Sequence, residues 1–188
     1  MTEETTPMTP EFERGEDVAS ERWEVLDADG APLGRIMLRG VNRFEPGEYH
    51  LVVGTCVQRP DGRILVTQRA PQKLTHPNMW EFPAGSALAG ESGEVAAARE
   101  LGEEAGIVVD AAELVRVGRV VERAKLFDVY FVRLASDPEV VMQLDEVSDF
   151  RWRTIDEVLD PDGPIDFAVP WRRRLAEVGE RLRELASS

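Results

Sequence analysis

Hydrophobic residues along the chain follow two different spacings. Short apolar or alternating runs bounded by turn residues predict strands, because a strand turns successive side chains to opposite faces. We predict strands over residues 23–26, 32–38, 51–57, 63–68, 114–121, 126–134 and 146–152. Near the C-terminus, apolar residues recur at three- and four-residue steps, which predicts an amphipathic helix over the sheet. These residues are Trp171, Leu175, Val178, Leu182 and Leu185.

Turn and cap residues mark several boundaries of these elements. The sequence Asp-Ala-Asp-Gly at 27–30 separates the first two strands and predicts a β-hairpin. Pro-Asp-Gly at 60–62 predicts the turn between the next two strands. Thr154, followed three residues later by Glu157, predicts a helix with a capping box. Strands and helices mixed along one chain predict an α/β protein.

Another helix is predicted over residues 91–105, which are rich in Glu, Ala, Leu and Arg. We expect it to begin near Ser86 or Gly90 and to end at Gly106, because glycine often terminates helices. Its sequence places three carboxylates close together.

Glu100, Glu103 and Glu104 lie at positions i, i+3 and i+4 and therefore share one helix face. The apolar residues Ala98, Leu101 and Ala105 point the other way. We therefore expect a helix that packs through its apolar side and presents an acidic side.

Carboxylates this close repel one another by roughly a few tenths of a kcal/mol per pair. Arg99 lies four residues before Glu103 and can hold one of them, which leaves the cluster negative. Mg²⁺ or Mn²⁺, which prefer carboxylate oxygens, would balance the remaining charge. A solvated acidic helix face is the alternative interpretation.

The stretch around this helix matches a known signature. It reads Gly, five residues, Glu, seven residues, then Arg-Glu-aliphatic-x-Glu-Glu-x-Gly-aliphatic. The constrained positions are Gly85, Glu91, Arg99, Glu100, Leu101, Glu103, Glu104, Gly106 and Ile107. In this signature, and more loosely over residues 22–186, the chain resembles the Nudix hydrolases. The resemblance implies a Nudix-type α/β/α sandwich with a mixed sheet, here preceded by the N-terminal hairpin.

The resemblance also implies an activity and a set of site residues. The activity is Mg²⁺-dependent hydrolysis of a diphosphate linked to a nucleoside or another moiety X, by a metal-activated water. The implied metal ligands are Glu100, Glu103, Glu104 and the Gly85 carbonyl. Glu103 and Glu104 are also assigned to catalysis together with Arg99, and Glu91, at the helix start, is assigned to the substrate side.

Residues outside the signature are candidates for further roles. Arg69 and Lys73 resemble basic positions that bind a substrate diphosphate, and two surface cations are the alternative. Family members often use another acidic residue as metal ligand or general base. Glu122 is the first candidate and Glu146 the second, and either could be an ordinary loop carboxylate.

Two other functions compete with hydrolysis. The preamble of the chain resembles the Nudix subgroup that includes isopentenyl diphosphate isomerase. That chemistry needs a cysteine after the tryptophan and several histidines, but Glu-Phe-Pro-Ala-Gly follows Trp80, and His50 and His76 are the only histidines. We expect His50 to be structural. A non-catalytic Nudix sensor domain is the main alternative, although a pure binder has no need for three clustered carboxylates.

Composition narrows the class of protein. The 188 residues predict one domain, over residues 21–188, after a flexible acidic tail at 1–20. A net charge of -14 argues against extended nucleic-acid binding, whereas a small diphosphate substrate remains compatible. The single cysteine, Cys56, is expected to be buried, and no signal or membrane segment is evident, so we expect a cytoplasmic protein. The resemblance makes a homodimer an expectation, although no segment specifies an interface.

Overall fold

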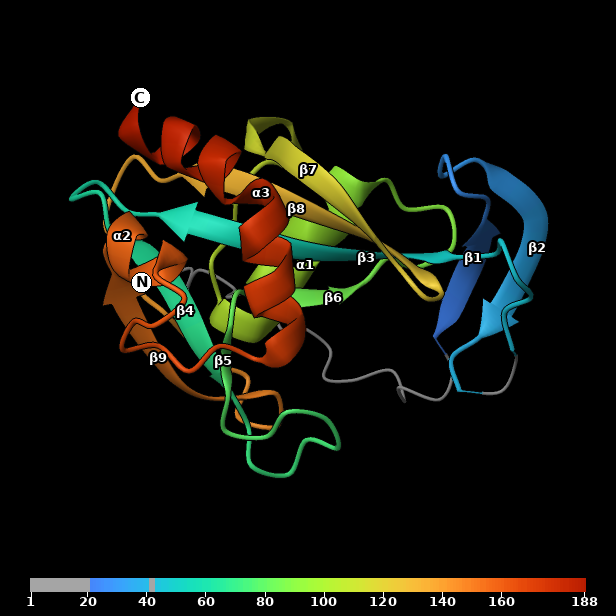
Figure 1. Cartoon of the computed structure of the whole chain (residues 1–188), viewed down its shortest axis with the longest axis horizontal. Helices are drawn as coiled ribbons and strands as arrows, with labels where there is room; N and C mark the ends of the chain where they lie inside the picture. The colour runs from blue at the N-terminus through green and yellow to red at the C-terminus, as the bar shows by residue number, and fades with distance from the viewer. Residues whose placement is uncertain (1–20, 41–42) are drawn as a thin grey trace, which may run out of the picture.

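A computed structural model describes residues 21–40 and 43–188 (Figure 1). The tail predicted for residues 1–20 lies outside the described residues. The strands are β1 (Arg22–Leu26), β2 (Pro32–Leu38), β3 (His50–Gln58), β4 (Ile64–Arg69), β5 (Trp80–Glu81), β6 (Ala84–Ser86), β7 (Val115–Glu122), β8 (Lys125–Arg133) and β9 (Val147–Arg153). The helices are α1 (Gly93–Ala105), the 3₁₀ helix η2 (Ala111–Glu113), α2 (Ile155–Leu159) and α3 (Val169–Ser187).

The predicted strands are confirmed, each boundary lying within one residue of its prediction. The sequence pattern missed β5, β6 and η2, because elements of two or three residues are too short to show a period. The predicted start of α1 was wrong, since the helix is capped by Ser92, whose side chain accepts from the Val95 amide. Its predicted end is confirmed at Gly106, where φ is 69°.

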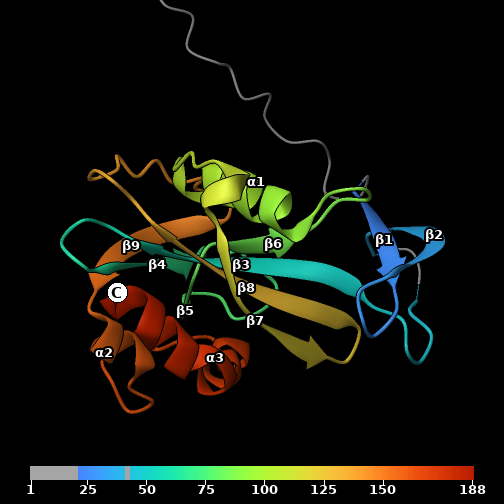
Figure 2. The ribbon, with the colours of Figure 1, turned by 90° about the horizontal axis from the view of Figure 1, so that it is seen from above.

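Strands β1 and β2 form a separate antiparallel sheet at one end of the molecule (Figures 1 and 2). The carboxylate of Asp27 closes their turn by accepting hydrogen bonds from the Asp29 and Ala31 amides, each at 2.9 Å. Gly30 has a φ of 89°, in the left-handed region that glycine adopts without strain. The predicted hairpin is therefore confirmed.

Backbone contacts join this small sheet to the rest of the chain. Leu26 and Tyr49 form a β-bridge, with hydrogen bonds of 2.8 and 2.9 Å in the two directions. The Ala89 amide, in the loop that leads into α1, donates to the Arg22 carbonyl at 2.7 Å. The hairpin is thus connected both to β3 and to the approach to α1.

His50 also contributes to this junction. Its ring stacks on Trp23 at a centroid distance of 4.2 Å and on Phe44 at 5.2 Å. Its Nδ1 donates to the Ala124 carbonyl at 3.0 Å. Burial lowers the His50 pKa to about 4, so the ring is neutral at neutral pH. The structural role expected for His50 is confirmed.

The main sheet is mixed. Its strand order is β5-β4-β3-β8-β7, with β6 also paired to β3 and β9 to β4. Strands β3 and β8 are parallel along their whole length, and the other pairs are antiparallel. Among the described residues, no helix combines the length and apolar character that crossing a membrane requires.

Helices cover both faces of this sheet, with α1 on one side and α2 and α3 on the other (Figure 2). Alternation along β3 supplies both cores: Val53 and Val57 pack beneath α1, whereas Val52 and Cys56 pack beneath α3. Cys56 is fully buried, as predicted, and burial raises the pKa of its thiol. The expected three-layer arrangement is present.

A glycine determines how closely α3 approaches the sheet. A Cβ atom on Gly54 would lie 2.6 Å from Cη2 of Trp171, far inside van der Waals contact. Trp171 fills this space and packs edge-on against Phe82 and Phe127, with centroid distances of 4.9 and 5.2 Å. The absence of a side chain at Gly54 therefore lets the first turn of α3 reach the sheet.

Candidate active site

A cleft of about 410 Å³ lies where α1, the β6 segment, the start of β8 and the first turns of α3 meet. It collects nearly all the residues singled out from the sequence. Those lining it are Gly85, Arg99, Glu100, Glu103, Glu104, Arg69, Lys73, Glu122 and Glu146. The exception is Glu91, which lies beside the cleft and contacts it through Arg99.

Arg99 organises the acidic cluster on α1. Its Nε and Nη2 donate to the two carboxylate oxygens of Glu91 at 2.8 and 3.0 Å. Its Nη1 donates to Glu100 at 2.9 Å and to Glu103 at 3.0 Å, and Nη2 also donates to the Ser86 carbonyl. One guanidinium thus holds three carboxylates, where the sequence analysis expected one.

The contact with Arg99 also fixes the ionisation of Glu91. Burial alone would raise the Glu91 pKa, but bonds from Arg99 and the Leu88 amide outweigh burial and lower it. Glu91 is therefore ionised and directed at Arg99 rather than at the cleft. Its geometry suits a residue that positions the arginine.

Gly85 leaves room for the carboxylate of Glu100. A Cβ atom at residue 85 would lie 2.0 Å from the Glu100 Cδ, which no side chain could tolerate. Strand β6 holds Gly85 in register with Val53 of β3, so the backbone cannot easily retreat. The glycine of the signature therefore has a steric reason in this fold.

Glu100 and Glu104 face inward, and the expected orientation of the acidic helix face was wrong for them. Glu104 is only 7% exposed and accepts a hydrogen bond from the Ala84 amide at 3.0 Å. Glu103 alone of the three is exposed. The buried face of α1 includes Glu104 beside Leu101 and Ala105. The two inward carboxylates therefore lie where this buried face borders the cleft.

Burial makes these inward carboxylates reluctant to ionise. It raises the pKa of Glu100 to about 7, with the charge of Glu103 adding to the effect and Arg99 opposing it. It raises the Glu104 pKa well above its usual range, with further contributions from the charges of Glu81 and Glu100. Carboxyl groups are therefore crowded at this end of the cleft, and their ionisation is unfavourable unless a cation accompanies it.

Glu81 belongs to the same group, although the sequence analysis did not select it. Its carboxylate lies in the cleft and accepts from Arg69 Nη1 at 2.6 Å, and burial raises its pKa. The sequence contained a sign of this placement, because the aromatic residues Trp80 and Phe82 on either side of Glu81 are core residues. Strand alternation then directs Glu81 to the opposite face, away from those aromatic rings.

The two predicted basic residues are already paired. Arg69 donates to Glu81 and to the Thr75 carbonyl, and Lys73 forms an ion pair with Glu146. Both cations line the cleft and hold acidic partners from other segments of the chain. A substrate phosphate would bind them by competing with these carboxylates.

Glu122 lies on the α3 side of the cleft. Both its oxygens accept from Arg174, at 2.8 and 3.0 Å, and the Arg174 side chain is 8% exposed. The guanidinium also lies 3.5 Å from the centroid of the Phe127 ring. Sequence reasoning could not find Arg174, because 52 residues separate it from Glu122.

The donor chemistry of the cleft fits a divalent cation. The Glu100 carboxylate fills the space that Gly85 leaves, and the charge of Glu103 repels it. A cation would relieve both the burial and the repulsion of these carboxylates. In the part of the chain that the structure describes, no three Asp, Glu, His or Cys side chains yet converge as a finished metal site. Because Arg99 bonds to Glu100 and Glu103, these two carboxylates would have to change partner to act as ligands.

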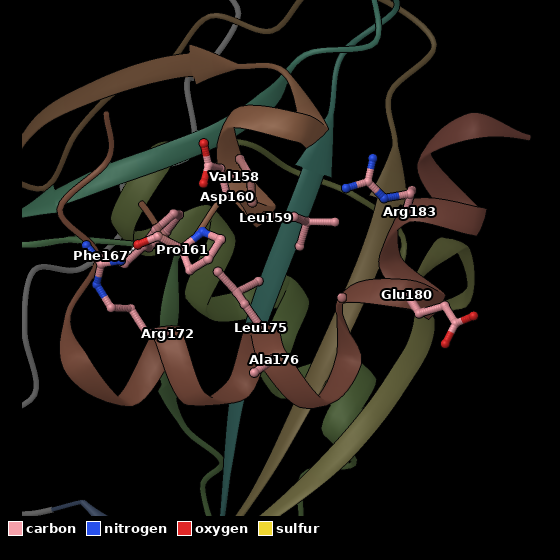
Figure 3. Close-up of a pocket in the computed structure, with 11 residues that line it drawn as sticks. Val158, Leu159, Asp160, Pro161, Phe167, Arg172, Leu175, Ala176, Glu180 and Arg183 are labelled. Carbon is pink, nitrogen blue, oxygen red and sulfur yellow. Dashed lines mark hydrogen bonds between the residues drawn. The ribbon is translucent and has the colours of Figure 1, made fainter. Parts of the chain in front are cut away.

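A separate cavity of about 310 Å³ lies between α2 and α3 (Figure 3). Leu159, Leu175 and Phe167 form much of its wall, and Asp160 and Glu180 stand apart at its margins. It lacks the crowded carboxylates of the first cleft. Of these two cavities, the cleft beside α1 is therefore the one with the chemistry described above.

Comparison with known proteins supports this assignment. The family model described as the NUDIX domain matches residues 48–175, more than half of the chain. A Listeria monocytogenes protein described as an uncharacterized Nudix hydrolase is 34% identical over 151 residues, covering 73% of this chain and 82% of its own.

Other relatives are named for isoprenoid chemistry. A prenyl-diphosphate phosphatase of Methanosarcina mazei is 28% identical, covering 71% of this chain and 79% of its own. An isopentenyl-diphosphate Delta-isomerase of Leifsonia xyli is 36% identical, covering 68% of this chain and 74% of its own.

Among solved structures, the Deinococcus radiodurans protein DR0079 superposes with a TM-score of 0.68 at 20% identity, covering 84% of this chain and 99% of its own. This likeness concerns the fold, whereas the family match covers the whole signature and most of the cleft built around it. The chain belongs to the Nudix hydrolase family, and its enzyme class is that of the Nudix pyrophosphohydrolases.

Proposed function

We propose that the protein is a divalent-metal-dependent hydrolase that cleaves a diphosphate linked to another moiety X, with water as the nucleophile. The observation that carries the proposal is the group of buried carboxylates at Glu81, Glu100 and Glu104. Such a group is costly unless a cation or a proton neutralises it. Its position in a polar cleft, beside a glycine that leaves space, favours a bound cation.

Different residues of this chain would bind the metal and orient its ligands. Glu100, Glu103, Glu104 and the Gly85 carbonyl would hold Mg²⁺ or Mn²⁺, which would neutralise phosphate charge and lower the pKa of a bound water. Arg99 would keep the carboxylates oriented through its bonds to Glu91 and Ser86. The metal ligands remain a proposal for this chain.

Arg69 and Lys73 are suited to bind the phosphate oxygens on the other wall. Both carry charged donors into the cleft, and charge-assisted bonds to phosphate are among the stronger polar contacts. Binding there would require each cation to exchange its carboxylate partner for the substrate.

Hydrolysis forms a bond between water oxygen and one phosphorus and breaks the bridging P–O bond. The proton released by the water must pass to a carboxylate in the cleft. Glu122 remains our first candidate for this base and Glu146 the second. Each would accept the proton while its cation, Arg174 or Lys73, holds it in place.

Isomerase chemistry has less support in this chain, despite the isomerase relative. Cys56 is the only cysteine and is fully buried in the core beneath α3. Burial raises the pKa of its thiol, which makes it a poor participant in proton transfer at the cleft. No other residue could replace it as a protonating thiol.

The test is product release from a broad panel with Mg²⁺: nucleoside triphosphates, nucleotide sugars, dinucleotides and isoprenyl diphosphates. Glu104→Gln should lower turnover by ~10² or more, the scale for loss of essential metal chemistry. Glu94→Gln is the matched control, because Glu94 lies on the same helix outside the cleft, and it should change turnover by less than about twofold.

Two results would contradict hydrolysis. Glu104→Gln could turn over substrate as fast as the wild type. Alternatively, no compound might be hydrolysed while Mg²⁺ still raises the melting temperature, which would favour the sensor function.

A further inference from the structure

Six cationic side chains line the cleft, and five of them are neutralised by carboxylates. The pairs are Arg39–Glu21, Arg69–Glu81, Lys73–Glu146, Arg174–Glu122 and Arg99 with Glu91, Glu100 and Glu103. The sixth is Lys125, which has neither an ion pair nor a side-chain hydrogen bond to any residue that the structure describes. Its ammonium is therefore the cleft cation available to a ligand without breaking a contact seen here.

Lys125 is separated from Gly85, beside the signature helix, by the width of the central strand β3. It is the first residue of β8 and pairs with His50 on one side of β3, whereas Gly85 pairs with Val53 on the other side. Three residues along a strand span about 10 Å, and two strand spacings span about another 10 Å. The turn of the β7–β8 hairpin points toward the N-terminal sheet (Figures 1 and 2), and Lys125 follows that turn as the first residue of β8.

The surroundings of Lys125 favour an incoming anion. Lys125 is exposed to solvent along part of its side chain, yet desolvation by the surrounding cleft lowers its pKa. The charge of Glu122 opposes this shift, and the positive charges of Arg174, Arg39 and Arg69 add to it. Arg174 and Arg39 are held by carboxylate partners, so they do not compete with Lys125 for an incoming anion. An anionic ligand group would offset the repulsion between these cations.

We propose that Lys125 binds a second phosphate group, carried by X and separate from the diphosphate that is cleaved. Lys commonly binds phosphate as a point charge, and the spacing from Gly85 places this phosphate away from the acidic helix. The inference rests on the proposed function, because it assigns part of the substrate of the same cleft. It predicts a substrate class in which X is phosphorylated rather than a bare hydrocarbon or nucleoside.

The test uses pairs of diphosphates that differ by one phosphate on X. Suitable pairs are coenzyme A with dephospho-coenzyme A and NADPH with NADH. The wild type should prefer the phosphorylated member of at least one pair by ~10-fold or more in kcat/KM, as expected for one hydrogen bond to a charged group. Lys125→Gln should abolish that preference and leave the other member unchanged.

Arg123→Gln is the matched control, because Arg123 is an exposed cation two residues away that does not line the cleft. It should retain the full preference. Equal losses on both members in Lys125→Gln would mean that Lys125 binds the cleaved diphosphate and would overturn the inference. A wild type without preference in either pair would overturn it too.

Calorimetric titration of the same pairs separates this inference from the proposed function. Tighter binding of the phosphorylated member, lost in Lys125→Gln, would support the phosphate site even if no compound were hydrolysed. Equal binding of both members would refute the phosphate site even if hydrolysis were observed.

Discussion

The wall of the cleft formed by α1 differs from the other walls in how its charged side chains are paired. On α1, a single guanidinium, Arg99, holds three carboxylates, and the inward Glu104 receives only a backbone amide. On the other walls, Arg69, Lys73 and Arg174 each match one carboxylate with one cation. This difference means that the α1 wall has more carboxyl groups than cations, so that either protons or an additional cation must neutralise them. The paired walls need no metal and can exchange partners with a substrate.

The largest effect should come from filling the space beside α1. Gly85→Ala puts a methyl group where the Glu100 carboxylate lies, so the carboxylate must move away from the cleft. We expect turnover to fall by ~10² or more, because a metal ligand would be displaced. Steady-state kinetics measures this, with Gly102→Ala on α1 as control, since a Cβ there comes no nearer than 4.0 Å to the Ile107 carbonyl oxygen. Near-normal turnover in Gly85→Ala would show that the α1 wall does not need the Glu100 position.

Breaking one of the one-to-one ion pairs should lower the stability of the fold. Arg174→Met leaves Glu122 partly buried without its bidentate partner and should lower the free energy of unfolding by about 2 kcal/mol. Urea denaturation measures the loss. The double variant Arg174→Met with Glu122→Gln should recover part of it. If the double variant is no more stable than the single one, Arg174 stabilises the fold through contacts other than its ion pair with Glu122.

The α1 wall should also respond to pH. The Glu100 pKa is about 7 in the fold and lower in the unfolded chain, so folding favours the protonated acid. Without metal, this carboxylate therefore destabilises the fold as pH rises from about 4.5 toward 7, and a bound cation should reverse the effect. We expect Mg²⁺ to raise the melting temperature by several degrees at pH 8 and by little at pH 5.5. Glu100→Gln should reduce the pH dependence, and a shift independent of pH would contradict this account.

The smallest effect on turnover should follow from a substitution outside the cleft. Ser92→Ala removes the side-chain cap of α1 at an exposed position, at a cost of about 1 kcal/mol in unfolding free energy. Turnover at temperatures well below melting should stay within about twofold, because no cleft residue is touched. Thermal denaturation and kinetics on the same sample check both expectations. A large loss of turnover would mean that the start of α1 controls the carboxylate geometry.

The local parts of the site were predictable from the sequence and the long-range parts were not. Arg99 and Glu103 are four residues apart on one helix, so their contact follows from helix geometry. The contact between Glu122 and Arg174 depends on how α3 is seated against β7, which no local spacing encodes. The inward direction of Glu104 likewise depends on which face of α1 meets the sheet.

The fold was predictable to a similar extent and for similar reasons. Strand positions followed from apolar runs and turn residues, such as the Asp27 turn that closes the first hairpin. The short strand β5 has no period of its own, and it forms because Trp80 and Glu81 pair with β4. The place of Glu81 in the cleft was therefore not predicted, although the core residues on either side of it indicate that its side chain faces away from them.

The junction between the N-terminal hairpin and α1 limits how the protein can be shortened. A protein beginning after β2 would lose the carbonyl that the Ala89 amide requires and the Trp23 ring that covers His50. The loop before α1 would then lose an anchor, and a neutral imidazole would become open to water and to protonation. The hairpin thus sets the ionisation of His50. Truncation at residue 44 should return the pKa of this ring toward the ordinary histidine value and remove the loss of stability that its burial causes as the pH falls from about 6.5 toward 4.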